Sequence, residues 1–203
     1  MLRGKIHESG EWTVFQVGRQ PLQPGIPLRR YYMHQYIRSV TQIQRLIDEG
    51  PAALTRDLSA PEWGRLNVNQ SELGLDPGIL KMMIVLEAIF EGARTRIAPW
   101  LPSRMDCVFT WSSLELARRF RSQYAPEGTV HRCRVLEGSA VELDGGLLPP
   151  GINLADLSPG ALSDEIGSTR ARAERYWNAG TAPDFPELLI VGSVEVIETV
   201  TDR

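Results

Sequence analysis

The sequence DFPELLIVGSVEVIETV at residues 184–200 predicts the last two strands of a β-sheet. An uninterrupted apolar run precedes Gly192, and apolar residues alternate with polar ones after it, and both patterns are typical of strands. Glu187 lies between Pro186 and the apolar run, at the start of a strand that is expected to be buried. Its carboxylate is therefore either a solvated strand start or a charge presented to a ligand.

More strands and several helices are expected on either side of this stretch. Residues rich in β-branched and aromatic side chains predict strands at 11–17, 105–111, 129–137 and 140–144, the last two joined by a turn at Gly138 and Ser139. Helical spacing of apolar residues predicts helices at 29–48, 77–97, 112–124 and 162–180. Mixed runs of strands and helices, with strands that neighbour each other in sequence, favour an α+β fold. Residues 1–203 are expected to form a single domain.

Three of the helices have recognisable details. The helix at 77–97 has the clearest apolar face, formed by Ile79, Met82, Met83, Leu86, Ile89, Phe90, Ala93 and Ile97. Ser112 and Glu115 fit a capping box at the start of the helix at 112–124. The inner face of the last helix carries Leu162, Ile166, Ala173 and Trp177, and we expect Tyr176 and Trp177 to belong to the core.

Residues 51–76 show weak periodicity and many turn-forming residues, so they predict a long irregular connection. Loops of this length in compact domains more often cover a site or bind a partner than merely connect. We expect the segment to lie over or beside the site containing Glu187. Trp63, its only aromatic residue, is expected to be partly buried, either anchoring the loop or contacting a ligand.

Composition and charge do not indicate a nucleic-acid-binding or a membrane protein. The formal net charge is −3, with 42% hydrophobic and 23% charged residues, which gives no overall attraction to nucleic acid or anionic lipid. Arginine runs at 118–121, 131–134 and 170–175 indicate solvated faces or, alternatively, a site for a phosphate-rich ligand. Cys107 and Cys133 lie in apolar stretches and are expected to be buried thiols. We expect a cytoplasmic protein without a signal sequence or a membrane-spanning segment.

The common nucleotide-binding and hydrolase motifs do not occur in the sequence. The three histidines, His7, His34 and His131, are far apart and do not have the spacing of metal ligands. We therefore expect no metal, and we expect each histidine to be a surface residue or a hydrogen-bonded core residue.

The order of the elements, with short sequences on them, resembles the ADP-ribosyltransferase superfamily, and most closely a bacterial group of unknown function of the DUF2441 type. The resemblance lies in FEGARTRIAPWLPSRMDCVFTW (90–111), SLELARRF (113–120), HRCRVLEGSAVELD (131–144) and RYWNAGTAPDFPELLIVGSVEVI (175–197). It implies a split β-sheet core with flanking helices. It also implies an enzyme that uses NAD as a substrate and transfers ADP-ribose to an unidentified acceptor, which is a protein, a nucleic acid or a small molecule.

Transferases of this superfamily resemble one another at three positions around NAD. Arg19 best matches the first, although it follows the opening strand by two residues and no histidine is nearby. Thr110 or Ser112 matches the second, and Glu187 matches the third, which makes it the catalytic carboxylate by resemblance. Arg104 is expected to bind a cofactor phosphate, or to pair with Asp106 or another carboxylate on the surface.

Two functions follow from the resemblance. The first is a mono-ADP-ribosyltransferase, and a toxin or effector role with an antitoxin or immunity partner is compatible with it. The second is a non-catalytic module on the same fold that binds a nucleotide or a partner protein.

Overall fold

The structure is a computed structural model that describes residues 12–18, 22–30, 36–59, 77–149, 152, 154, 158–178 and 182–201. Its chain packs into two compact units. The sheet unit consists of residues 1–34, 100–147 and 178–203, and the helical unit consists of residues 35–99 and 148–177. Packing does not test whether the chain folds as one domain, so the single domain over residues 1–203 stays a prediction.

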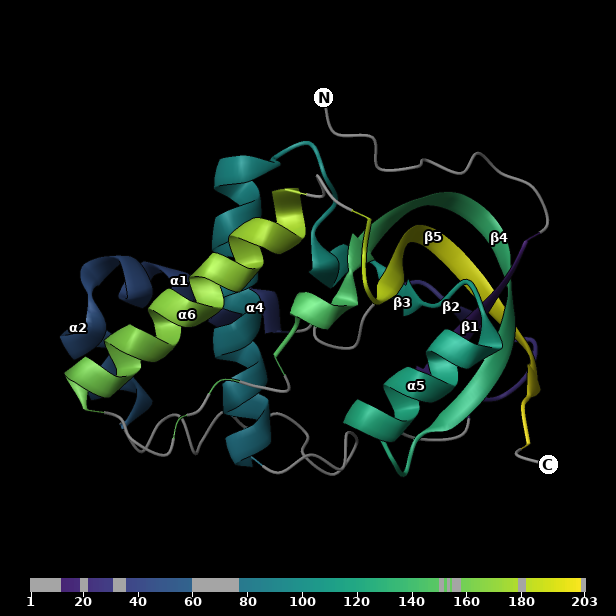
Figure 1. Ribbon diagram of the computed structural model, residues 1–203, viewed down its shortest axis with the longest axis horizontal. Coiled ribbons are helices and arrows are strands. Elements are labelled where there is room, and N and C mark those ends of the chain that lie inside the picture. Colours follow the sequence, from purple (N-terminus) through teal and green to yellow (C-terminus); the bar gives the residue numbers. More distant parts are fainter. Residues whose placement is uncertain are drawn as a thin grey trace. The chain divides into compact units, whose positions relative to one another are not determined.

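The sheet unit contains one five-stranded antiparallel sheet (Figure 1). Its strands are β1 (Thr13–Gly18), β2 (Pro27–Leu28), β3 (Val108–Thr110), β4 (Thr129–Asp144) and β5 (Pro186–Thr199). They follow the order β1-β4-β5-β2, and β3 also pairs with β5. The described residues also contain five α-helices, so the predicted mixture of strands and helices is confirmed.

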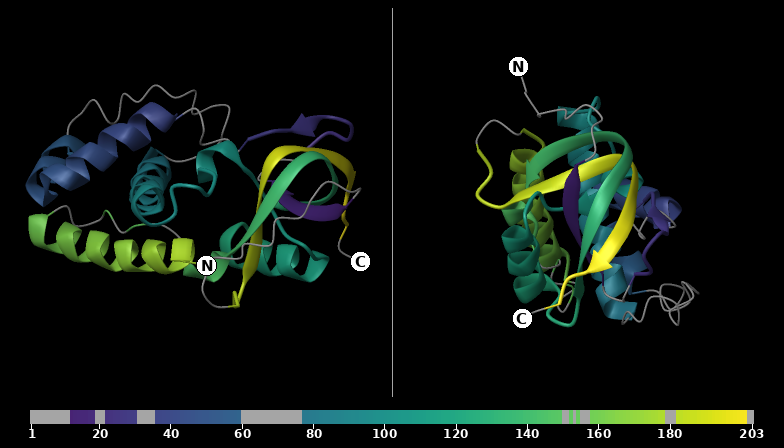
Figure 2. Two further views of the ribbon diagram at one scale, coloured as in Figure 1. Left: turned by 90° about the horizontal axis from the view of Figure 1, so that it is seen from above. Right: turned by 90° about the vertical axis from the view of Figure 1, so that its right-hand side faces the viewer.

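The sheet curls back toward its own edge. Trp111 is the residue after β3, and it exchanges two backbone hydrogen bonds with Phe15 of β1. The Phe15 N–H donates to the Trp111 carbonyl at 2.8 Å, and the Trp111 N–H donates to the Phe15 carbonyl at 2.7 Å. β1 is therefore paired with β4 on one side and held to the end of β3 on the other. The curvature of the long strands is visible in the right-hand view of Figure 2.

β4 and β5 are each a single bent strand, so the prediction of two shorter strands in each place is wrong. The bend occurs where Gly138 pairs with Gly192, and both residues have positive φ, 123° and 145°. A Cβ atom on Gly138 would lie 1.9 Å from the Val191 carbonyl oxygen, and one on Gly192 would lie 2.1 Å from the Glu137 oxygen. Glycine usually signals a turn in sequence, but here β4 and β5 are paired on both sides of the two glycines, with register shifts between Arg132 and Cys133 and between Val135 and Glu137.

The two faces of the sheet pack differently. One face encloses an apolar cluster of Val14, Val108, Cys133, Val135, Ala140, Leu188, Ile190, Val194 and Val196. The other packs α5 (Leu114–Tyr124) through a second cluster, in which Trp111, Ala117, Val130 and Phe185 are buried. Successive side chains of a strand point to opposite faces, so the two clusters draw on alternate residues of the strands.

The start of α5 differs from the predicted capping box. Ser113, not Ser112, is the N-cap residue, and its hydroxyl oxygen accepts a hydrogen bond from the Leu116 N–H at 3.2 Å. Either serine is a good N-cap residue, although Glu115 completes the capping-box pattern only with Ser112, and the backbone decides which of them faces the first helical turn.

The helical unit contains α1 (Ile37–Glu49), α2 (Pro51–Leu58), α4 (Pro77–Ile97) and α6 (Pro159–Asn178). The left-hand view of Figure 2 shows α4 between α1 and α6. Trp177 of α6 donates its indole N–H to the Phe90 carbonyl of α4 at 2.7 Å. The predicted inner face of α6 is confirmed, and so is the placement of Tyr176 and Trp177 in the core.

Because α4 lies between two helices, its buried surface is wider than a single stripe. Leu80, Ile84, Val85 and Ala88 are buried although they lie outside the predicted apolar face. Ile79, which was placed on that face, is 40% exposed. The helix itself is confirmed.

The first part of the predicted irregular connection is helical, so that prediction is wrong for residues 51–58. Pro51 suits the first turn of α2, and Leu54 and Leu58 are buried one turn apart. The ammonium group of Lys81 donates to the Leu58 carbonyl at 2.8 Å and ties α2 to α4. Residues 60–76, with Trp63, lie outside the described residues, so their placement near Glu187 stays a prediction.

The predicted strand at 105–111 is shorter than expected. It begins as a 3-10 helix, η3 (Arg104–Asp106), and only β3 is extended. Cys107 and Cys133 are confirmed as buried free thiols. Among the described residues, no helix combines the length and the apolar composition needed to span a bilayer.

Candidate active site around Glu187

Glu187 is buried at the start of β5, with 3% of its surface exposed. Leu143 of β4 is its cross-strand partner. One carboxylate oxygen, Oε1, accepts a hydrogen bond from Arg104 Nη1 at 2.8 Å. Glu187 is thus not a solvated strand start, because its charge is enclosed and paired inside the sheet unit.

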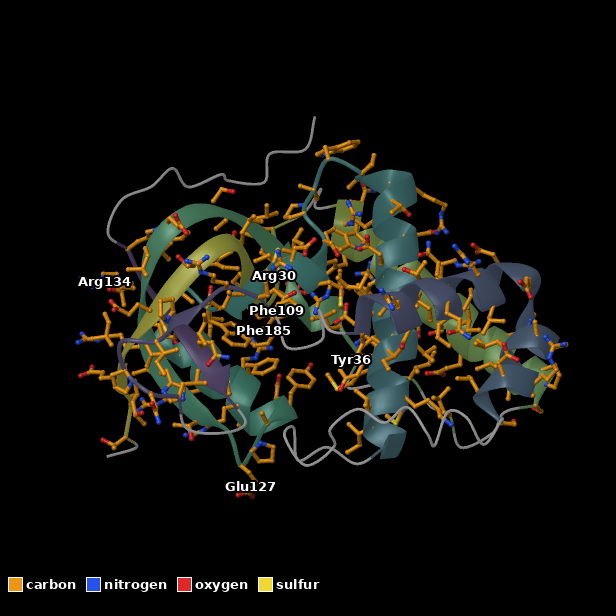
Figure 3. The ribbon with its side chains drawn as sticks, turned by 180° about the vertical axis from the view of Figure 1, so that it is seen from behind. Arg30, Tyr36, Phe109, Glu127, Arg134 and Phe185 are labelled. Carbon is orange, nitrogen blue, oxygen red and sulfur yellow. The ribbon has the colours of Figure 1, made fainter. Side chains whose placement is uncertain are left out.

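Arg104 reaches Glu187 from η3. Ser103 caps this short helix by accepting a hydrogen bond from the Met105 N–H at 3.3 Å. The Arg104 guanidinium carbon lies 4.4 Å from the centroid of the Phe109 ring. Stacking on the ring and pairing with Glu187 together fix the plane and the edge of the guanidinium. Phe109 is labelled in Figure 3.

The protein partner of Arg104 is neither Asp106 nor a nearby carboxylate on the surface. Its contact with a cofactor phosphate stays a prediction. The structure pairs Arg104 with a carboxylate 83 residues away, and the two side chains are only 7% and 4% exposed. An ion pair so far from water carries a large desolvation cost, and it is weak evidence for a purely stabilising role.

A tight turn after β4 supports the start of β5. One carboxylate oxygen of Asp144, Oδ1, accepts hydrogen bonds from the Gly146 N–H at 3.0 Å and the Phe185 N–H at 3.2 Å. The Gly145 N–H donates to the Phe185 carbonyl at 2.9 Å. A Cβ atom on Gly145 would lie 3.2 Å from the Phe185 carbonyl oxygen and 3.4 Å from both Cβ and Cδ of Glu187, so this turn lies next to the Glu187 side chain.

Sequence reasoning missed the role of this turn. The Asp-Gly-Gly sequence at 144–146 is a turn signal, because an aspartate side chain readily accepts backbone N–H groups two residues on. Nothing local in the sequence shows that the turn meets Glu187, about forty residues later, because strand pairing brings the two together.

Thr110 is close to Glu187 in the sheet but belongs to the other face. It pairs with Leu188 in the register of β3 and β5, and directly paired residues share a face. Its hydroxyl donates to the Leu188 carbonyl at 3.3 Å, and the residue is fully buried. The structure therefore brings Arg104 to Glu187 but turns the Thr110 side chain away from it.

Ser112 and Arg19 are the other two predicted cofactor-binding residues. Ser112 is exposed just before α5. Arg19 lies outside the described residues, so its role as the first cofactor contact stays a prediction.

His131 and Cys133 of the sheet unit also have reactive side chains, but both are buried in its core. His131 is fully buried, where its Nε2 accepts a hydrogen bond from the Leu22 N–H at 3.3 Å and its Nδ1 lies 3.3 Å from Thr199 Oγ1. Burial raises the pKa of the Cys133 thiol to about 12, which makes it unreactive at neutral pH. In the described part of the chain, no three His, Cys, Asp or Glu side chains gather as a metal site. His7 and His34 lie outside it.

These observations define a mixed α/β protein whose curled antiparallel sheet holds a buried arginine–glutamate pair at the end of its longest strand pair. Comparison with family models then assigns the chain to a family. The model described as "Protein of unknown function (DUF2441)" matches residues 64–202, so the protein belongs to the DUF2441 family. The matched range contains Arg104, Thr110, Ser112 and Glu187. A comparison with curated proteins gave no match.

Proposed function

We propose that the protein is an NAD-dependent mono-ADP-ribosyltransferase built on an ADP-ribosyltransferase-like core, and that Glu187 is its catalytic carboxylate. One observation carries the proposal: a buried carboxylate at a strand start, held by an arginine at 2.8 Å. The resemblance of the sequence to that superfamily points to the same residue.

The chemistry of the proposed reaction requires such a group. Cleavage of the bond between nicotinamide and ribose passes through an oxocarbenium-like sugar, as in glycoside hydrolysis. Nicotinamide is already cationic in NAD, so its departure needs no general acid. A fixed carboxylate that accepts a hydrogen bond from a ribose hydroxyl and faces the developing positive charge lowers the barrier electrostatically.

Arg104 is a positioning residue in this mechanism. Its contact with Oε1 and its stacking on Phe109 restrict the orientation of the Glu187 carboxylate. The Gly145 turn restricts the same group from the β4 side. A restricted carboxylate needs little reorganisation as charge develops on the sugar, which is where fixed protein groups have the greatest effect on rate.

Nicotinamide release tests the proposal. Purified protein is incubated with NAD labelled in the adenine moiety, with and without a cell lysate, and both free nicotinamide and transferred label are measured. We expect release and transfer by the wild type and a loss of at least about 100-fold in Glu187→Gln, the range found when an essential electrostatic group is removed. Thermal melting of the variant shows whether it is folded. A folded Glu187→Gln protein with wild-type rates would overturn the catalytic role.

A non-catalytic binding module is the second candidate function. It is favoured by the contacts of two predicted site residues, since the Thr110 hydroxyl is bonded to the Leu188 carbonyl and the Glu187 carboxylate to Arg104. Calorimetry with NAD and ADP-ribose, run beside the nicotinamide assay, separates the two functions. Binding without release favours the module.

An effector or toxin role, with an antitoxin or immunity partner, extends the proposal. Expression in a bacterial host should then arrest growth, and the Glu187→Ala protein should not. Growth arrest that persists in a folded Glu187→Ala protein would separate toxicity from the proposed chemistry.

A further inference from the structure

Arg119 is an exposed side chain held in a defined place. It belongs to α5, and its guanidinium carbon lies 4.7 Å from the centroid of the Phe185 ring. Phe185 is only 2% exposed, because it is part of the apolar cluster beneath α5. A cation over a buried aromatic ring is attracted to the ring face, so the position of the Arg119 guanidinium is restricted although the side chain meets solvent.

The N–H groups of Arg119 are not used within the described part of the chain. Arg94, Arg104 and Arg134 each bond a glutamate there, whereas Arg119 has only its contact with Phe185. A guanidinium carries five N–H donors in its plane, and stacking occupies the face of the group rather than its edge. The edge of Arg119 is therefore available to an anion.

The aromatic ring under this guanidinium is close to Glu187 along the chain. Phe185 precedes Glu187 by two residues, a separation of at most about 7 Å in extended chain. The turn at Asp144 bonds the Phe185 N–H, and Gly145 of the same turn packs against Glu187. The Phe185 ring under Arg119 and the Glu187 carboxylate are thus both positioned by the turn at Asp144 and Gly145.

A second donor near Glu187 is unused as well. Trp111 is 2% exposed, and its indole N–H has no acceptor in the described part of the structure. β3 pairs Thr110 with Leu188, so Trp111 follows at the level of Glu187, and it shares the apolar cluster of Phe185. A buried donor without a partner is costly unless a ligand or water satisfies it.

We propose that Arg119 forms an anion subsite beside Glu187, and that it binds the pyrophosphate of NAD. A planar guanidinium suits phosphate oxygens, because two parallel N–H groups can bond two of them at once. The identity of the dinucleotide rests on the proposed function, whereas the anion subsite rests on the contacts of Arg119 alone.

Binding measurements with phosphate-containing probes test the subsite without requiring turnover. The affinities of ADP, inorganic pyrophosphate and adenosine are measured by calorimetry for the wild type, Arg119→Gln and Arg118→Gln. Arg118 is the matched control, because it is an exposed arginine on the same helix and loses the same charge. Arg119→Lys keeps the charge but lacks the flat fork.

We expect Arg119→Gln to weaken ADP and pyrophosphate binding by about tenfold or more, the effect of losing a charge-assisted contact. Arg119→Lys should fall between it and the wild type, and Arg118→Gln should bind within about twofold of the wild type. Adenosine, which has no phosphate, should bind equally to all four proteins.

The outcomes separate the subsite from the enzyme. If ADP binding depends on Arg119 but the protein releases no nicotinamide from NAD, the result supports the subsite and contradicts the proposed activity. Nicotinamide release with equal ADP affinities in Arg119→Gln and Arg118→Gln overturns the subsite and keeps the activity. A wild-type protein that binds neither ADP nor pyrophosphate overturns the subsite as well.

Discussion

The two arms of the bent β4–β5 strand pair carry ion pairs in opposite environments. One arm, residues 139–144 with 186–191, contains the Glu187 carboxylate, whose pair with Arg104 is nearly inaccessible to water. In the other arm, residues 129–137 with 193–199, Arg134 pairs with Glu195 across the strands at 2.6 Å, and their side chains are 44% and 24% exposed. Gly138 and Gly192 separate the arms.

The comparison shows that distance alone does not give the importance of an ion pair. The shorter pair is the solvated one, and exposed pairs contribute only about 0–1 kcal/mol because water and salt screen them. The buried pair would cost several kcal/mol if one partner were removed, yet apolar residues would often stabilise the same place better. In our proposal, the charges at this place serve the cleavage of NAD rather than stability.

Replacing Gly192 by alanine should have the largest effect, because it removes the bend that separates the two arms. The new Cβ would lie 2.1 Å from the Glu137 carbonyl oxygen, at a φ of 145° that side chains rarely adopt. We expect a loss of roughly 5 kcal/mol in unfolding free energy, or an unfolded protein, from backbone strain and overlap together. Chemical denaturation measures it. Gly167→Ala is the control, since its Cβ would meet nothing within 4 Å. Equal stability of the two variants would contradict the bend.

Removing one partner of the buried pair should have the next largest effect. Arg104→Met leaves the Glu187 charge without the guanidinium, and we expect a loss of about 3–4 kcal/mol in unfolding free energy. The double variant Arg104→Met/Glu187→Met removes both charges and should recover most of that loss, because methionine fits beside Phe109. If the double variant were as unstable as the sum of both single variants, the two residues would not act as a pair.

Gly145→Ala should have a moderate and selective effect on the Glu187 arm. Its Cβ would lie 3.2 Å from the Phe185 carbonyl oxygen, so the backbone two residues before Glu187 must give by a few tenths of an ångström, and the Glu187 side chain, in contact at 3.4 Å, is expected to move with it. We expect about a tenfold lower rate of nicotinamide release with a stability change of about 1 kcal/mol.

Gly146→Ala is the matched control for this shift. Its Cβ would meet Asp144 and Phe185 but not Glu187. It should perturb the same turn and leave the rate close to that of the wild type. Equal rate losses in both variants would show that the turn as a whole matters, rather than the placement of Glu187.

Arg134→Gln, in the solvated arm, should have the smallest effect. The Glu195 partner stays hydrated, so we expect a change below about 1 kcal/mol in unfolding free energy, smaller still in high salt. Denaturation at low and high salt measures it. A loss as large as that of Arg104→Met would remove the distinction between the two arms.

The sequence predicts features that depend on local periodicity. The helices at α4, α5 and α6 were found because their apolar residues recur within a few turns, and the wide burial of α4 became visible only through its neighbours. The sequence predicts a turn at Gly138 and a separation of two strands at Gly192, because a glycine that ends a strand and a glycine inside a strand give the same local signal. Local reasoning also missed α2, where Leu54 and Leu58 supply only one turn of helical spacing.

The candidate site was predicted in part. The position of Glu187 before an apolar run and the resemblance together single it out in the sequence, and the structure adds that it is buried. The partner of Arg104 is 83 residues distant, so only strand pairing and the placement of η3 reveal it. Thr110 is one of two residues matched to the second position around NAD, and the alternation of side chains along paired strands places it on the face opposite Glu187.

Nicotinamide release by the Arg104→Met/Glu187→Met protein tests the central claim most directly, because this variant loses the charges without leaving one of them unpaired. Denaturation must first show that it is as stable as the wild type to within about 1 kcal/mol. The account predicts that this folded protein releases nicotinamide from NAD at least about 100-fold more slowly than the wild type. A folded double variant that releases nicotinamide at the wild-type rate would show that the buried pair is structural and that Glu187 is not the catalytic carboxylate.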